Sequence, residues 1–358
     1  MIRCPLTGSE NVKILYQQKS VPLFQNKVYP TQHEAIVAPE ADVILAQSLD
    51  TGFVFSGDFD INLLDYDANY QNEQSNSQFF QQHLESVIEI MDKNNLLEGK
   101  VLEIGCGKGF FMDILLERGV DITGIDPTYE GTSPSVIKDY YGEKYAYLDA
   151  NFIILRHTLE HIPKPLDFIQ MIAKANNYKG KIYIEIPTFD WIMNNNAVED
   201  IFYEHCNYFV PDTIKLLFEE CQCEYIFNGQ YIGIIAELGK VKEKVKKVEG
   251  VKPYETTFAD KIDIYRQLVN DYDNLAIWGA GAKGSTFLNL IDKDCRKVKC
   301  VIDINPKKQN RYIGGTGHII VPPNEIQNYG VENILVMNTN YLNEIKTIIN
   351  NKINLITL

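Results

Sequence analysis

The 358-residue sequence contains no hydrophobic stretch long enough to cross a membrane. Its first residues also lack the apolar core of a secretory signal peptide. Positive charge is scarce, because 34 lysines and arginines stand against 48 aspartates and glutamates and give a formal net charge of −14. This balance argues against nucleic-acid phosphates or an anionic membrane surface as the main partner. We therefore expect a cytoplasmic protein with neither kind of partner.

Paired cysteines are also missing. The seven cysteines form no Cys-x-x-Cys pair, which favours reduced thiols over a disulfide framework. A zinc ribbon would place Cys-x-x-Cys-Gly at two points, yet residues 4–8 read CPLTG and residues 48–52 read SLDTG. Three of the four ligand positions thus carry hydroxyls, which stay protonated near neutral pH and bind zinc poorly. One thiolate with His33 would not close a site, so we predict residues 1–65 to be a β-rich, ribbon-like module without metal. We expect no zinc and no metal-binding residues in the protein.

The most informative stretch is a strand-like run that ends in three alternating glycines, residues 101–109 (VLEIGCGKG). Gly105, Gly107 and Gly109 have no Cβ atom to hold a ligand away, and they permit positive φ. The helix expected from Phe110 would point its free N–H groups at the same place. The pattern predicts a turn that binds a cofactor.

Two carboxylates frame this turn. Glu103 precedes the first glycine, where it suits the α-amino group of a sulfonium cofactor and does not suit a pyrophosphate. Asp126 ends the next apolar stretch, about 20 residues on, where a carboxylate can accept hydrogen bonds from both ribose hydroxyls. The dinucleotide spelling Gly-x-Gly-x-x-Gly is absent here. The two carboxylates around the turn favour S-adenosylmethionine over NAD as the cofactor and predict a methyltransferase. The alternative is a structural glycine turn with acidic residues on the surface.

Strand and helix signals alternate through the middle of the chain. Strands are expected near 100–105, 121–126, 151–156 and 180–186, and helices near 79–95, 109–118, 164–176 and 211–221. This alternation is typical of a mostly parallel α/β sheet covered on both faces. Residues 223–227 and 231–237 read as an antiparallel hairpin around Asn228-Gly229. A hairpin at this position is a mark of class I methyltransferases.

A second α/β unit follows a lysine-rich linker at 240–252. Its glycine turn does fit Gly-x-Gly-x-x-Gly through Gly279, Gly281 and Gly284, so an NAD-dependent oxidoreductase stays an alternative. The fold class we predict is α/β, with a class I methyltransferase Rossmann-like sheet between two smaller parts. The predicted domains are the ribbon-like module at 1–65, the methyltransferase domain at 66–240 and a second Rossmann-like domain at 241–358.

Two histidine-containing segments offer a base. Residues 155–161 (LRHTLEH) should line the far side of the cofactor through Arg156 and His157, and we interpret the histidines of this segment as structural. Residues 202–208 (FYEHCNY) bring a carboxylate, an imidazole and phenols close together, which suits proton transfer. We expect His205 to be the base, and the alternative is a helix start with exposed polar groups.

Short motifs along the whole chain carry a family resemblance. They are EIGCGKGFF (103–111), GIDP (124–127), LEHI (159–162), EIP (185–187), YEH with YF (203–205 and 208–209), GAKG (281–284) and DINP (303–306). Together they resemble the nucleotide-sugar C-methyltransferase family. The resemblance implies a nucleotide-linked keto-deoxysugar as substrate, methylation at the carbon beside the ketone, and a surface-polysaccharide or glycoside pathway. The sequence does not specify the oligomeric state, for which we expect a monomer.

The resemblance also implies residue roles. His205 would remove the proton, Glu204 and a neighbouring tyrosine, here Tyr203, would steady the enolate, and Tyr70 would match a substrate-side tyrosine in the loop over the site. The C-terminal glycine turn would shape the substrate cleft without holding a dinucleotide. Phe202 stands where the family pattern has a tyrosine. An O-methyltransferase, in which a sugar hydroxyl is deprotonated, therefore remains an alternative, as does a non-catalytic nucleotide-sugar binding protein.

Overall fold

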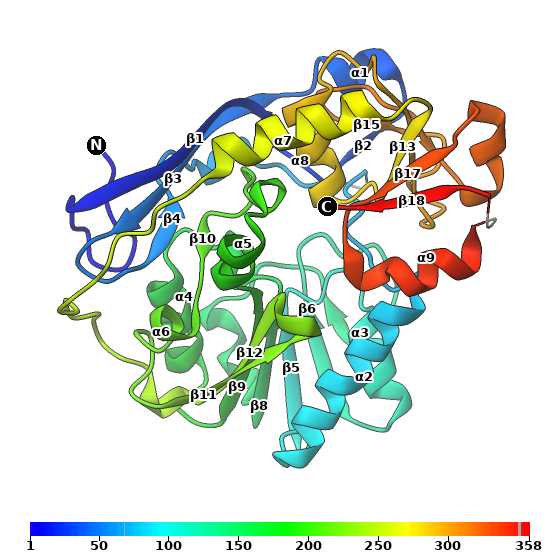
Figure 1. Cartoon of the computed structure of the whole chain (residues 1–358). Coiled ribbons are helices and arrows are strands. Elements are labelled where there is room, and N and C mark those ends of the chain that lie inside the picture. The colour runs from blue at the N-terminus through cyan, green and yellow to red at the C-terminus, as the bar shows by residue number, and fades with distance from the viewer. Residues whose placement is uncertain (68, 350–351) are drawn as a thin grey trace.

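The computed structural model describes every residue except 68, 350 and 351. The chain forms three parts: an N-terminal sheet, a large sheet with helices on both faces, and a C-terminal α/β unit (Figure 1). Residues from the N-terminal region, the large sheet and the C-terminal unit line one cavity. Within the described ranges, no helix is both long and apolar enough to cross a membrane.

The largest sheet has seven strands in the order β11-β12-β9-β8-β5-β6-β7. They are β5 (Lys100–Ile104), β6 (Asp121–Ile125), β7 (Val136–Ile137), β8 (Phe152–Arg156), β9 (Lys181–Pro187), β11 (Cys221–Ile226) and β12 (Tyr231–Glu237). β5 to β9 pair in parallel, whereas β12 pairs antiparallel with both β9 and β11. Counted along the chain, the spatial order is 3-2-1-4-5-7-6. The predicted class I methyltransferase sheet, closed by an antiparallel hairpin, is confirmed.

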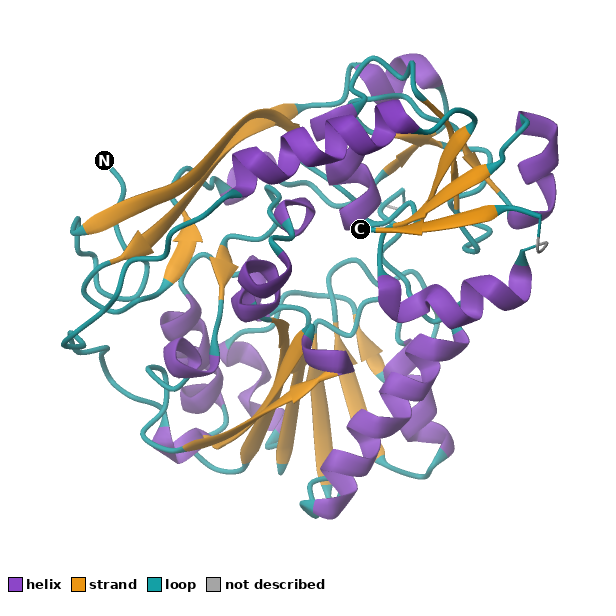
Figure 2. Cartoon of the chain, viewed as in Figure 1, coloured by secondary structure: helices purple, strands orange, loops and turns teal. Residues whose placement is uncertain are grey.

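Helices cover both faces of this sheet (Figure 2). The helices of this region are α2 (Gln78–Lys93), α3 (Phe110–Glu117), α4 (Pro165–Ala175), α5 (Phe189–Asn195) and α6 (Pro211–Ile214). Apolar side chains of α2 and α3 pack with Val101 and Ile154 on one face, while those of α4 pack with Leu102 and Ile153 on the other. Successive strand residues therefore point to opposite faces, and both faces are buried, as a central parallel sheet requires.

One predicted helix is much shorter than expected. The sequence predicted a helix over 211–221, but α6 ends at Ile214. Beyond it, Phe218 forms an isolated bridge with Val241, and Lys242 donates its backbone N–H to the Leu217 carbonyl at 2.9 Å. Tertiary pairing with the strand-like 241–242 segment thus replaces the local helix preference.

The N-terminal strands do not form a sheet of their own. β1 (Val12–Pro22), β3 (Glu40–Ser48) and β4 (Val54–Ser56) pair antiparallel, and the fourth strand is β10 (Asn207–Tyr208), which comes from the methyltransferase region. The short β2 (Val28–Tyr29), followed by α1 (Gln32–Ile36), pairs with β15 (Tyr312–Ile313) near the other end of the chain. At the degenerate ribbon positions, the buried Cys4 Sγ lies 4.0 Å from Thr51 Oγ1. The expectation of a separate N-terminal module was therefore incomplete, because its strands also pair with β10 and β15, and pairing between segments so far apart in the chain has no signal in the sequence. The domain boundary at residue 65 stays a prediction.

The C-terminal unit contains a five-stranded parallel sheet in the order β16-β14-β13-β17-β18. Its strands are β13 (Leu275–Trp278), β14 (Val298–Ile302), β16 (Ile320–Val321), β17 (Asn333–Val336) and β18 (Asn354–Thr357), and its helices are α7 (Phe258–Asp271), α8 (Ala282–Ile291) and α9 (Leu342–Ile348). α8 follows β13 directly across the second glycine turn, which is the arrangement predicted for a second Rossmann-like unit. α7 lies along β1, where Tyr16 and Phe258 meet edge to face with ring centroids 5.6 Å apart (Figure 1).

Candidate active site

A cavity of about 410 Å³ lies where the three parts meet. Both glycine turns line it, with Gly105 and Gly107 on one side and Gly279 and Gly281 on the other. Each turn follows the carboxyl end of a parallel strand, which is where open α/β sheets bind ligands. His205 lines the same cavity.

The first glycine turn is shaped for close approach. Gly105 has φ +76°, and a Cβ there would lie only 2.4 Å from Thr158 Oγ1. Gly107 has φ +56° and borders open space, because a Cβ at this position would meet no described atom within 4 Å. Gly109, at φ 85°, caps the amino end of α3. Larger residues would strain or fill the turn, so its backbone is left open to a ligand.

Glu103 has a buried carboxylate oxygen without a hydrogen-bond partner among the described residues. It is 2% exposed, lines the cavity, and its Oε2 makes no hydrogen bond within the described part of the chain. Burial raises its pKa to about 7, although the Arg156 guanidinium opposes that shift. Such a group needs a positively charged or donating partner. An orphaned carboxylate beside an open glycine turn fits the amino group and the body of S-adenosylmethionine.

Asp126 supports the turn from behind. Its Oδ2 accepts a hydrogen bond from the Gly107 N–H at 2.8 Å, and its Oδ1 accepts from the Thr128 N–H and hydroxyl, both at 2.7 Å. Asp126 is not among the described residues that line the cavity. The structure therefore places it against the turn rather than in the cavity, and its predicted contact with a ribose stays a prediction.

Arg156 and His157 line the cavity beside Glu103, and both are held by Glu185. Arg156 Nε lies 2.8 Å from Glu185 Oε2, and His157 Nε2 lies 3.1 Å from Glu185 Oε1. Burial alone would lower the pKa of His157, but its hydrogen bonds to Glu160 and Glu185 outweigh burial and raise the pKa to about 9. His83 of α2 also contacts Glu185 Oε1, at 2.7 Å. The anchoring by Glu185 was not predicted from the sequence, where its place in the EIP motif was its signal.

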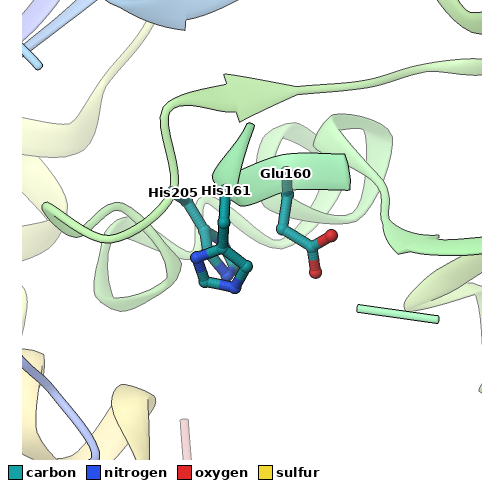
Figure 3. Close-up of side chains that lie close together, drawn as sticks. All are labelled: Glu160, His161 and His205. Atoms are coloured by element: carbon teal, nitrogen blue, oxygen red, sulfur yellow. The ribbon is translucent and has the colours of Figure 1, made fainter. Parts of the chain in front are cut away.

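Two histidines and a glutamate meet beside the cavity (Figure 3). The ring centroids of His161 and His205 are 4.9 Å apart, and Glu160, His161 and His205 each offer one ligand atom within 4.8 Å of the others. Burial, together with the nearby His161 and His157, holds the pKa of His205 well below its usual value. His205 is therefore neutral at neutral pH, which is the form that accepts a proton. The same three side chains are a donor set for a divalent cation.

The other predicted catalytic residues lie behind the cavity wall, with one exception. Tyr70 lines the cavity. The Glu204 carboxylate is fully buried and accepts the Gln25 N–H at 2.7 Å. Burial raises its pKa above the usual value, although the nearby His161 and hydrogen bonds from Gln25, Tyr70 and Tyr66 oppose that shift. The Tyr203 hydroxyl instead lies 2.9 Å from a backbone nitrogen of the N-terminal region. The structure thus brings His205 and Tyr70 together at the cavity, while the roles predicted for Glu204 and Tyr203 stay predictions.

A polar contact between the two halves of the cavity wall was also not predicted from the sequence. Lys283, from the second glycine turn, pairs with Asp200, just before the segment that carries His205. Its Nζ also lies 5.9 Å from the centre of the Trp191 ring. Phe202, at the position where a tyrosine was expected, packs against His205 with ring centroids 4.1 Å apart and the ring planes tilted by 44°. None of these contacts has a local sequence signal, because each joins residues that are distant in the chain or defined by packing.

The second glycine turn is largely satisfied by its own chain. Asp303 accepts hydrogen bonds from the Ala280 and Asn305 N–H groups, both at 2.8 Å. A Cβ at Gly284 would lie 1.9 Å from the Gly279 carbonyl oxygen. The third glycine of this motif is therefore explained by close packing of α8 on the turn.

Comparisons with known proteins agree with the methyltransferase sheet. Residues 75–226 match a family described as a methyltransferase domain, and residues 271–355 match one described as C2185-like, N-terminal. The chain is 22% identical to the C-methyltransferase NovU of Streptomyces niveus over 304 residues, which cover 74% of this chain and 72% of that protein. It is also 24% identical to the ubiquinone biosynthesis O-methyltransferase of Idiomarina loihiensis over 163 residues, which cover 38% of this chain and 66% of that protein.

A solved structure, a SAM dependent methyltransferase from Archaeoglobus fulgidus, aligns with a TM-score of 0.34 and 19% identity, over 45% of this chain and 100% of its own. The family match covers the core of the seven-stranded sheet from α2 to the first strand of the closing hairpin. One assignment follows from the strand order, from the glycine turn with its buried carboxylate, and from the match of residues 75–226 to the methyltransferase family. The chain is an S-adenosylmethionine-dependent methyltransferase with a class I methyltransferase domain.

Proposed function

We propose that the enzyme methylates a nucleotide-linked keto-deoxysugar at the carbon beside the ketone, with His205 as the base. The observation that carries the proposal is the neutral His205 imidazole on the wall of the cavity that also contains Glu103 and the open glycine turn. The similarity to a protein named as a C-methyltransferase supports carbon as the acceptor. The composition and family resemblance support a cytoplasmic enzyme of polysaccharide or glycoside synthesis.

Each residue at the cavity has a distinct task in this proposal. Glu103 holds the amino group of S-adenosylmethionine, and the bound cofactor supplies an electrophilic methyl group. His205 accepts the proton from the substrate carbon, and the Tyr70 hydroxyl turns from Glu204 to donate its hydrogen bond to the oxygen on which charge develops. The amino end of α8 offers N–H groups and partial positive charge to the nucleotide diphosphate across the cavity.

A second candidate is methylation of a sugar hydroxyl. It is favoured by Phe202, which brings an apolar ring and no hydroxyl next to His205. The similarity to ubiquinone biosynthesis O-methyltransferases points the same way. In this case His205 would deprotonate an oxygen, and no proton on carbon would exchange.

Mass spectrometry in D₂O separates the two candidates. A panel of nucleotide sugars, with and without a 4-keto group, is incubated with the enzyme with and without S-adenosylmethionine. Carbon methylation predicts that a keto sugar takes up deuterium without the cofactor and gains a methyl group with it, and that His205→Gln loses both. The exposed His33 provides the matched control, His33→Gln. A methyl gain without exchange would favour oxygen as the acceptor, and no mass change with any sugar would contradict the proposed substrate class.

A further inference from the structure

We propose that Glu160, His161 and His205 form a binding site for a zinc-like divalent cation, and that a cation bound there inhibits the enzyme by occupying the base. Two of these residues lie in the 3-10 helix Leu159–His161, just beyond β8, and the third precedes β10. Their ligand atoms lie within 4.8 Å of one another, and Figure 3 shows all three side chains projecting to the same side. Two imidazoles and one carboxylate are ligands that zinc and its neighbouring transition metals favour.

Hydrogen bonds orient the loop of Glu160 and His161 and the loop of His205 toward one another. His161 Nδ1 lies 2.8 Å from the Glu204 carbonyl oxygen, so this nitrogen must be the donor, and in the neutral ring Nε2 carries the lone pair. Ligating histidines are typically held in this way by a backbone carbonyl. The Cys206 N–H also donates to the Glu160 carbonyl at 2.9 Å, which ties the loop of His205 to the loop of Glu160.

Glu160 gives an independent indication of a missing ligand. It is 2% exposed and lines the cavity, yet its Oε2 has no hydrogen-bond partner among the residues that the structure describes. The other oxygen lies 3.7 Å from His157 Nδ1. A buried carboxylate oxygen without a partner is costly, and a cation would remove that cost.

The three ligand atoms are somewhat farther apart than they would be around a bound zinc ion. A tetrahedral zinc site with bonds of about 2.0–2.1 Å separates its ligand atoms by about 3.4 Å. Side-chain rotations that bring each donor inward by about 1 Å would therefore close the site. Three protein ligands would leave the fourth position to water on the cavity side.

A cation at this site would inhibit the enzyme, because the metal ion and the substrate proton need the same electron pair of His205. A neutral imidazole nitrogen accepts either a proton or a metal ion with the same lone pair. A cation held by His205 therefore removes the proposed base. This consequence rests on the proposed function, whereas the binding of the cation does not.

Calorimetry on the metal-free full-length enzyme tests the site directly. Titration with Zn²⁺ should show one site, and Glu160→Gln and His161→Gln should each weaken it by more than about tenfold, the smallest loss expected even from changes around a metal site. His33→Gln, which alters an exposed histidine of α1, should leave the affinity unchanged. Mg²⁺ should not bind, because it prefers oxygen ligands in octahedral geometry. Circular dichroism confirms that each variant is folded, and equal zinc affinity in wild type and both site variants would overturn the site.

Activity tests the consequence. Zn²⁺ should abolish deuterium exchange and methyl transfer with a midpoint equal to the calorimetric Kd, and EDTA should restore both. Stimulation by Zn²⁺ would overturn the inhibitory role. An enzyme that binds zinc as described but, free of metal, alters no sugar would contradict the proposed function and leave the metal site standing.

Discussion

Cofactor binding should depend on pH through Glu103. In the free enzyme, burial raises the pKa of this carboxyl to about 7, so it is about half protonated at pH 7 and almost fully protonated at pH 5. Only the ionised carboxylate attracts the cofactor's ammonium group, which stays charged below its own pKa of about 7.7–8.0. The apparent affinity scales with the fraction of competent protein. Because that fraction falls from about one half to about one hundredth, binding should be about fifty-fold weaker at pH 5 than at pH 7.

The assay is calorimetric titration with S-adenosylhomocysteine, which has the same amino group and is not consumed. Measurements at half-unit steps from pH 5 to pH 7 should give an affinity that rises almost tenfold per unit at the acid end and flattens near neutrality. The matched variant Glu103→Gln keeps the side-chain shape and cannot ionise, so it should bind weakly and with no such slope. A flat profile in the wild type, or the same slope in the variant, would refute the assignment of Glu103.

Three further predictions concern stability and the placement of residues. The folded-state pKa of Glu103 lies above its usual value of 4.5, so the fold disfavours the ionised form and the free energy of unfolding falls as pH rises from 4.5 through 7. Glu103→Gln should therefore raise the free energy of unfolding by up to about 3 kcal/mol at pH 8 and by little near pH 4.5. Urea denaturation of both proteins at the two pH values measures this difference. Gly284→Ala should lower the melting temperature strongly, since its Cβ would lie 1.9 Å from the Gly279 carbonyl oxygen, whereas Gly281→Ala, whose Cβ has no contact closer than 3.7 Å among the described residues, should change it little. Tyr203→Phe should lose about 1 kcal/mol of stability with its backbone hydrogen bond and keep kcat, so a large loss of kcat at unchanged stability would restore the catalytic role predicted from sequence.

Several elements could be predicted because their signals are local. The first glycine turn is a continuous strand, turn and helix, so apolar pattern and glycine spacing together define it. The hairpin of β11 and β12 was predicted in the same way, from two apolar runs around Asn228-Gly229. In the structure Asn228 adopts φ 55°, a left-handed conformation that asparagine tolerates. Glu103 could be singled out because its neighbours in sequence are also its neighbours in space.

Other features were decided by packing between distant segments. The pairing of β10 with β4 joins residues about 150 positions apart, and no local preference encodes it. His161 was interpreted as structural, yet the fold brings its ring to 4.9 Å from His205. The Glu204 carboxylate, adjacent to His205 in the chain, points instead to Gln25 of the N-terminal region.

The sequence by itself therefore determined the class of sheet, the two glycine turns and the place of a carboxylate, Glu103, beside the first of them. These follow from hydrophobic period, backbone freedom and the charge of a few neighbouring residues. Only the tertiary structure decided which polar side chains face one cavity. Adjacent residues in a loop can point in opposite directions, and burial then decides which of them is neutral, which is ionised and which lacks a partner.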